Sequence, residues 1–115
     1  MNNHINKIYP ICLFLICIPL ILEAQIKKGY DLYNLGDKKD ALKEFHHITM
    51  SDTGNAEANF MVGKCYLETV RKELSLPYFI KAYHHNKKIS PDILLKIGQA
   101  YQMNSKFDEA PRWMR

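Results

Sequence analysis

Apolar and polar residues recur along most of the chain with the spacing of amphipathic helices. The pattern predicts helices at about 24–35, 38–50, 56–69, 73–85, 91–103 and 107–115. Ser90, Pro91 and Asp92 have the residue types that begin a helix, and Asn55 can cap a helix that begins at Ala56. Gly36 and Asp37 can end one helix and cap the next. No segment alternates with period two over the length of a strand, so the sequence predicts an all-α fold.

Three glycines give the predicted helices a repeat. Gly63 follows Gly29 by 34 residues, and Gly98 follows Gly63 by 35 residues. A small residue stands twelve positions after each glycine and a large apolar residue sixteen after: Ala41, Ser75 and Ala110, then Phe45, Phe79 and Met114. Glycine inside a helix costs about 1 kcal/mol relative to alanine, so its recurrence needs a packing reason. We expect close approach of a partner helix at each glycine, and therefore pairs of antiparallel helices A and B.

The joint spacing of these residues resembles the tetratricopeptide repeat (TPR) family. The matching residues are Gly29, Gly36, Asp37, Ala41, Phe45 and Ile48 in the first repeat, Gly63, Tyr66, Phe79 and Ala82 in the second, and Gly98, Tyr101, Phe107 and Ala110 in the third. The resemblance spans residues 22–115. It implies a short TPR solenoid of about two and a half repeats, at about 22–55, 56–90 and 91–115, the last being incomplete.

Two stretches, residues 55–67 and 97–110, are also similar to the N-terminal TPR region of exported bacterial envelope proteins. In those proteins a β-propeller-like region and an OmpA-like, peptidoglycan-binding domain follow, and this chain has neither. The resemblance thus implies the front part of such a protein.

Some residues depart from the family pattern. Val70 and Arg71 replace the usual Gly-Asp between the helices of the second repeat, and Pro77 and Pro111 fall near the starts of B helices. The sequence stops partway through the third B helix, which would leave Trp113 half covered. Two interpretations follow: a truncated chain, or an end completed by self-association.

The first 24 residues have the pattern of a secretory signal peptide. Met1 to Lys7 is polar with one cation, residues 8–22 are apolar apart from two prolines, and Ala24 offers a small residue for cleavage. We expect cleavage after Ala24, which would leave residues 25–115 as the TPR domain. The apolar run is shorter than the roughly 20 residues of a membrane span, but an uncleaved N-terminal anchor remains the alternative.

Composition narrows the classes of partner. The chain is 47% hydrophobic with a net charge of +4, and its lysines are spread along the sequence, which argues against nucleic-acid binding. Cys12 and Cys17 lie inside the signal segment, without the small residues that lipidation requires. Cys65 is then the single cysteine of the mature chain, and we expect it to be a small buried residue.

The TPR resemblance implies a concave groove lined by helix A residues. Carried over by position, this predicted groove presents Tyr30, Tyr33 and Asn34, then Phe60, Lys64 and Leu67, then Gln99 and Gln102, flanked by Ile26, Glu68, Leu95 and Met103. Such a mixture suits capture of a peptide or helix. Ile26, Phe60 and Leu95 have an equal alternative, since apolar residues at helical spacing also complete the packing between repeats.

The sequence gives little support for a metal site or for catalysis. The pairs His46-His47 and His84-His85 place adjacent side chains about 100° apart on a helix, which suits solvated histidines better than a metal site. No catalytic motif is present, so we predict no enzyme activity, no cofactor and no metal.

Two functional hypotheses remain, beside a third interpretation in which the chain is an inert remnant of a broken gene. The first is an exported scaffold, periplasmic or associated with the outer membrane, that binds a protein partner in its groove. The second is the N-terminal spacer module of a larger OmpA-like, peptidoglycan-anchored protein of the outer membrane.

Overall fold

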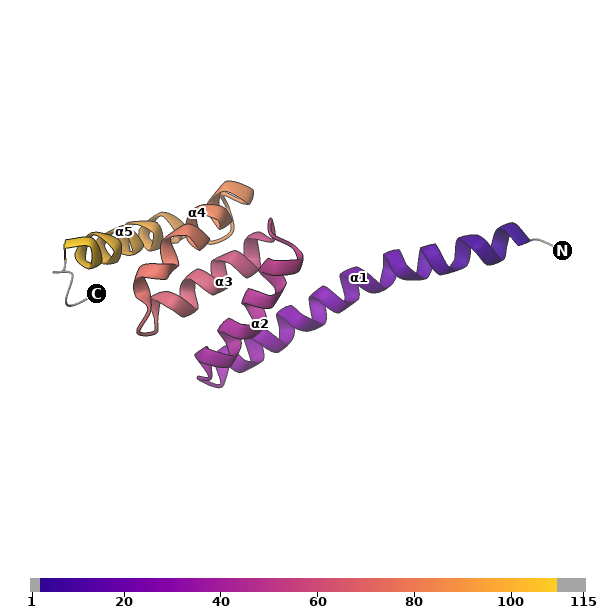
Figure 1. Ribbon diagram of the computed structural model, residues 1–115, viewed down its shortest axis with the longest axis horizontal. Coiled ribbons are helices and arrows are strands. Elements are labelled where there is room, and N and C mark those ends of the chain that lie inside the picture. The colour runs from indigo at the N-terminus through magenta and orange to yellow at the C-terminus, as the bar shows by residue number, and fades with distance from the viewer. Residues whose placement is uncertain (1–2, 110–115) are drawn as a thin grey trace.

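The computed structural model describes the backbone of residues 3–109 and the side chains of residues 19–105. Its elements are α1 (Asn3–Asn34), α2 (Lys38–Ser51), α3 (Ala56–Leu67), the short 3-10 helix η1 (Lys72–Leu74), α4 (Ser75–His85) and α5 (Ile93–Glu109). Figure 1 shows α2 to α5 stacked beside the C-terminal half of α1, while the N-terminal half of α1 projects away. The described part of the chain contains helices and no strands, which confirms the predicted all-α class.

Helix α1 joins the predicted signal segment to the first helix of the stack. It runs without a break from Asn3 to Asn34, so the expected helix start near residue 24 is wrong. Residues 20–25 are helix-forming types with no glycine or proline, and nothing there ends a helix. No helix among the described residues is both long and apolar enough to cross a membrane.

The turn between α1 and α2 depends on one glycine. Gly36 has a φ angle of 87°, in the left-handed region that favours glycine. The Asp37 amide donates to the Leu32 carbonyl and the Gly36 amide to the Tyr33 carbonyl, both at 3.0 Å, which is a Schellman ending. The Asp37 carboxylate then accepts from the Asp40 amide at 3.1 Å and caps α2, as the sequence predicted.

The turn between α2 and α3 depends on asparagine side chains. Asn55 Oδ1 accepts from the Ala58 amide at 2.9 Å, so the predicted cap of α3 is confirmed. Asn59, which is buried, donates from Nδ2 to the carbonyls of Thr53 and Asn55. These bonds tie the connecting loop to the first turns of α3.

The connection from α3 to α4 has no glycine turn. Thr69 Oγ1 donates to the Tyr66 carbonyl at 3.0 Å as α3 ends, and Val70 is left exposed. Residues 72–74 then form η1, and Ser75 Oγ donates to the Lys72 carbonyl at 2.7 Å where α4 begins. Pro77 lies in the first turn of α4, where its missing amide hydrogen costs no helical bond.

Helix α5 corrects two sequence predictions. It begins at Ile93, two residues after the expected start at Pro91, and it continues to Glu109 without a turn between residues 103 and 107. Residues 104–106 contain no glycine or proline to end the helix, unlike the first turn with its Gly36. The separate helix expected at 107–115 is therefore wrong for residues 107–109, and residues 110–115 lie outside the described part.

Two of the three repeated glycines have the predicted close contact. A Cβ atom added at Gly29 would lie 2.6 Å from Phe45 Cζ of α2, and one added at Gly63 would lie 2.9 Å from the Phe79 ring of α4. Both phenylalanines are fully buried. Each ring occupies the space that the absent side chain leaves open. The pair α1–α2 and the pair α3–α4 therefore pack in the same register.

The third glycine does not have this contact. A Cβ atom added at Gly98 would meet no atom within 4 Å, so the predicted close approach at this position is wrong for the described residues. The residue sixteen positions on is Met114, outside the described part, and α5 does not turn back before Glu109. Leu94, Leu95 and Tyr101 of α5 are also exposed.

The buried side chains form two adjoining clusters. The first joins α1, α2 and α3 around Phe45, Ile48, Met61 and Val62. The second joins α3, α4 and α5 around Phe79, Ile93 and Ala100. Phe60 packs against both clusters, so the core is continuous from α1 to α5.

We predict opposite effects for alanine at the covered and uncovered glycines. Gly29→Ala and Gly63→Ala should each lower the free energy of unfolding by about 1–3 kcal/mol, because the added methyl overlaps a buried ring. Gly98→Ala should raise it by up to about 1 kcal/mol, because alanine favours the helix and nothing opposes the methyl. Urea unfolding followed by circular dichroism measures all three, and equal destabilisation at the three positions would contradict the packing described here.

Candidate functional site

The predicted groove residues come from three helices. Tyr30, Tyr33 and Asn34 lie on α1, Phe60, Lys64 and Leu67 on α3, and Gln99 and Gln102 on α5. Direct interactions link Tyr30 to α3 and Tyr33 to Glu68, the residue that follows α3. The α5 members are exposed and make no side-chain hydrogen bond with another described residue.

Tyr33 is the centre of a polar cluster, the Tyr33 cluster, formed with Lys38, Lys64 and Glu68. Its hydroxyl donates to Glu68 Oε2 at 2.5 Å, and Lys38 Nζ lies 3.1 Å from the same oxygen. Lys64 Nζ stands 5.1 Å from the centre of the Tyr33 ring, and Lys38 Nζ stands 5.6 Å from it. Both ammonium groups are within the range of cation–π attraction.

Within the Tyr33 cluster, the pKa values of Glu68 and Tyr33 are shifted in opposite directions. Partial burial alone raises the pKa of Glu68, but the hydrogen bonds from Tyr33 and Lys38 and the charges of both lysines outweigh it and lower that pKa below 4.5. Burial, followed by the bond to Glu68, raises the pKa of the Tyr33 hydroxyl. Glu68 is therefore ionised and Tyr33 is a neutral hydrogen-bond donor at neutral pH.

Tyr30 makes a second link between α1 and α3. Its hydroxyl donates to Glu57 Oε1 at 2.8 Å, and its ring meets Phe45 edge to face with centroids 5.3 Å apart. Burial, and then the bond to Glu57, raises the pKa of Tyr30. The tyrosine thus connects a polar contact on α3 to the buried ring on α2.

The apolar members of the predicted groove divide into packed and exposed residues. Phe60 is half-buried, with its ring centre 5.8 Å from that of Phe79, and Ile26 packs against the first core cluster. Leu67 packs against the second cluster. Leu95 is 63% exposed, so it does not complete the packing between helices. Packing therefore accounts for Ile26 and Phe60 but not for Leu95.

The remaining predicted residues face solvent to different degrees. Asn34, Gln99 and Gln102 are exposed, and Met103 is half-buried. Sequence reasoning missed Lys38 and Glu57, which the structure joins to Tyr33 and Tyr30. Lys38 is the first residue of a B helix and Glu57 a first-turn acid, and both positions resemble ordinary solvated ends of helices.

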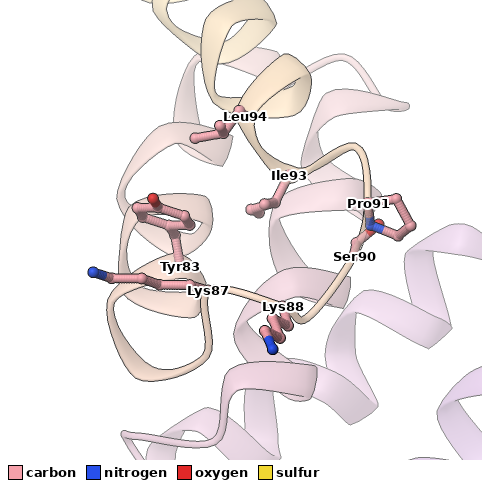
Figure 2. A pocket seen from close by; sticks show the side chains of 7 residues that line it. All are labelled: Tyr83, Lys87, Lys88, Ser90, Pro91, Ile93 and Leu94. Atoms are coloured by element: carbon pink, nitrogen blue, oxygen red, sulfur yellow. The ribbon is translucent and has the colours of Figure 1, made fainter.

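A separate recess lies where α4 ends and α5 begins. It has a volume of about 380 Å³, and Figure 2 shows Tyr83 on one side, Ile93 directed toward the centre and Leu94 above it. Lys87 and Lys88 belong to the connecting loop at its edge. The recess shares no residue with the Tyr33 cluster.

The histidine pairs and the cysteine have local partners. His46 Nε2 lies 3.2 Å from the Tyr78 hydroxyl, and the His84 and His85 rings meet edge to face. Among the described residues no three His, Cys, Asp or Glu side chains converge as metal ligands would. Cys65 is fully buried, as predicted, and burial raises its pKa to about 11.

Comparison of this chain with protein-family models, with curated proteins and with solved structures finds no match.

We predict that Glu68 stabilises the fold in a pH-dependent way. Because its pKa is lower in the folded state, its contribution is present above pH 4.5 and is lost as the pH falls through the folded value. Glu68→Gln should cost about 1 kcal/mol of unfolding free energy at pH 7 after allowance for solvent screening. The difference from the parent chain should shrink below pH 4.5.

Urea unfolding at pH 7, 4.5 and 3 measures this dependence. Tyr33→Phe provides a control, because it removes the hydroxyl donor and should reduce the effect of a second Glu68→Gln change. A Glu68→Gln cost that stays constant from pH 7 to pH 3, or strictly additive effects of the two changes, would contradict the described cluster.

We predict that Cys65 is unreactive in the folded chain. Its pKa of about 11, against an ordinary 9.0, lowers the thiolate fraction at pH 8 about a hundredfold, and burial blocks access as well. Cys12→Ser and Cys17→Ser changes leave Cys65 as the single thiol. Reaction with an aromatic disulfide reagent should then be at least about a hundredfold slower in buffer than in 8 M urea, and equal rates would show that the thiol is accessible.

Proposed function

We propose that this chain is a TPR-type helical scaffold that binds a peptide or helix of a partner protein across residues of α1, α3 and α5. The observation that carries the proposal is the repetition of one helix pairing. Gly29 with Phe45, and Gly63 with Phe79, place α1 and α3 in equivalent positions against α2 and α4. Repeated helix pairs align successive helices and build extended binding surfaces.

The proposed contacts use the accessible polar groups of the three helices. The Lys64 and Lys38 ammonium groups and the Tyr33 ring offer donors and an aromatic face, while Asn34, Gln99 and Gln102 offer exposed amides. Glu68 already neutralises part of the charge of the two lysines. The surface therefore suits a partner with mixed polar and apolar groups better than a purely acidic tail.

We further propose that the chain is exported and acts in the periplasm or at the outer membrane. The basis is the polar, apolar and small-residue pattern of residues 1–24, with cleavage after Ala24. Leu22 packs against the first core cluster. Cleavage would therefore remove a core contact of α1 but none of the proposed binding residues.

The second candidate function is a spacer module in a larger peptidoglycan-anchored protein. The exposed face of α5 favours it, because Gly98 is open and Leu94 and Leu95 are more than half exposed. A further helix packed there would extend the stack. This role needs no occupied groove, and the experiment below separates the two functions.

Partner retention by matched variants tests the scaffold function. The immobilised full chain is incubated with an envelope extract, and retained proteins are quantified by mass spectrometry. We expect two variants to weaken the retention of one protein about tenfold: Lys64→Glu, and the double change Gln99→Ala with Gln102→Ala. A loss of this size is typical when contacts at the centre of an interface are removed. Lys43→Glu, an equal charge change at an exposed α2 position, should have no effect.

Circular dichroism of each variant shows whether the fold is kept. The two glutamines are exposed, so their replacement tests binding without disturbing the contacts between helices. Equal retention by all variants would overturn the groove as the binding surface. Absence of any retained protein would favour the spacer function.

A further inference from the structure

The recess between α4 and α5 combines an apolar interior with a cationic edge. Ile93, 3% exposed, forms its floor, and Tyr83 and Leu94 form two sides. Figure 2 shows the side chains of Lys87 and Lys88 extending in different directions from the loop beside it. The two ammonium groups therefore stand at different places along the edge of the recess.

The segment from Leu74 to Pro91, which supplies most of the recess, is basic and contains no acidic residue. Between Glu73 and Asp92 there is no aspartate or glutamate, while Lys81, His84, His85, Lys87 and Lys88 are all exposed. None of these three lysines forms an ion pair with another described residue.

The carboxylate that follows this segment is already engaged. Asp92 accepts a hydrogen bond from Ser90 Oγ and lies 3.8 Å from Lys96 Nζ. The bond from Ser90 is the main cause of the lowered pKa of Asp92. Asp92 therefore has partners of its own and forms no ion pair with Lys87 or Lys88.

We propose that this recess is a second binding site, which takes an acidic peptide segment with one apolar side chain. The apolar side chain would occupy the space between Tyr83, Ile93 and Leu94. Carboxylates on either side of it in the peptide would contact Lys87 and Lys88. The assignment rests on charge complementarity together with the shape of the recess, and it is independent of the Tyr33 cluster.

The shape favours a peptide over other polyanions. A recess of about 380 Å³ accepts a protruding side chain, whereas a lipid surface needs several cations and apolar groups on one flat face. Binding of single-stranded nucleic acid relies on several stacking aromatics along a cationic groove, and Tyr83 is the single aromatic side chain among the described residues that line this recess.

Titration of the ¹⁵N-labelled full chain with a synthetic peptide tests the proposal. The probe is a heptapeptide with a central leucine and three glutamates on each side. We expect amide shifts to concentrate in residues 83–94. The double change Lys87→Glu with Lys88→Glu should weaken binding of the peptide about tenfold or more, and so should Leu94→Asp. The control, Lys39→Glu with Lys43→Glu, makes an equal charge change on α2 and should alter binding less than about twofold.

The remaining arms have defined outcomes. A matched peptide with glutamines in place of the glutamates should bind at least about tenfold more weakly, and 0.5 M salt should weaken the glutamate peptide. Equal loss in the two double-lysine variants, shifts centred outside residues 83–94, or equal binding of the glutamine peptide would overturn the site. Binding of the chain to phosphatidylglycerol vesicles without any response to the peptide would also overturn it. Because Lys87 and Lys88 are exposed, the charge variants should keep the parent circular dichroism spectrum.

Discussion

The contact between a helix glycine and a phenylalanine of the following helix determines how this molecule is built. At Gly29 and Gly63 the missing side chain lets the Phe45 and Phe79 rings lie against the helix backbone. Both rings are fully buried, so each contact fixes the separation and register of two helices at the centre of a core cluster. The polar interactions on the surface depend on this spacing, because Tyr30 touches Phe45 and also bonds to Glu57 on α3.

Some of the residues proposed to bind a partner also link helices within the molecule. Tyr33 and Lys64 interact across α1 and α3, and Glu68 joins them with Lys38. Such a cluster keeps the side chains in one arrangement before a partner arrives, which reduces the entropy lost on binding. It also makes a partner compete with interactions that are already formed. The exposed amides of α5 carry no such cost, so the proposed face combines constrained and free groups.

The sequence predicted features that one local interaction determines, and missed those that depend on competition between elements. The Asn55 cap, the Gly36 turn and the close approach of a partner helix at Gly29 and Gly63 follow from residue types at fixed spacing, although the sequence did not indicate that a phenylalanine ring makes the contact. The end of α5 does not, because residues 104–106 allow both a turn and a continuous helix and no local signal decides between them. For the site, the TPR resemblance implied that Tyr33 and Lys64 share one surface, and the Lys64 ammonium group lies 5.1 Å from the centre of the Tyr33 ring. Their partners Lys38 and Glu57 were missed because which surface charge pairs with which tyrosine depends on packing.

Unequal cover of the helices has a consequence for motion. Helix α3 has neighbours on both sides, whereas α5 packs chiefly against α4 and η1 and leaves Gly98 and Leu95 in solvent. In such a stack each helix is stabilised mainly by its neighbours. A helix with a neighbour on one side therefore opens with a lower free energy than a helix with neighbours on both sides. Backbone amides of α5 would then exchange with solvent deuterium through openings that leave α1 to α3 closed. The recess beside Ile93 lies where α5 meets α4. A ligand bound there would contact both helices, so it would hold α5 against the stack and slow the hydrogen exchange of its amides.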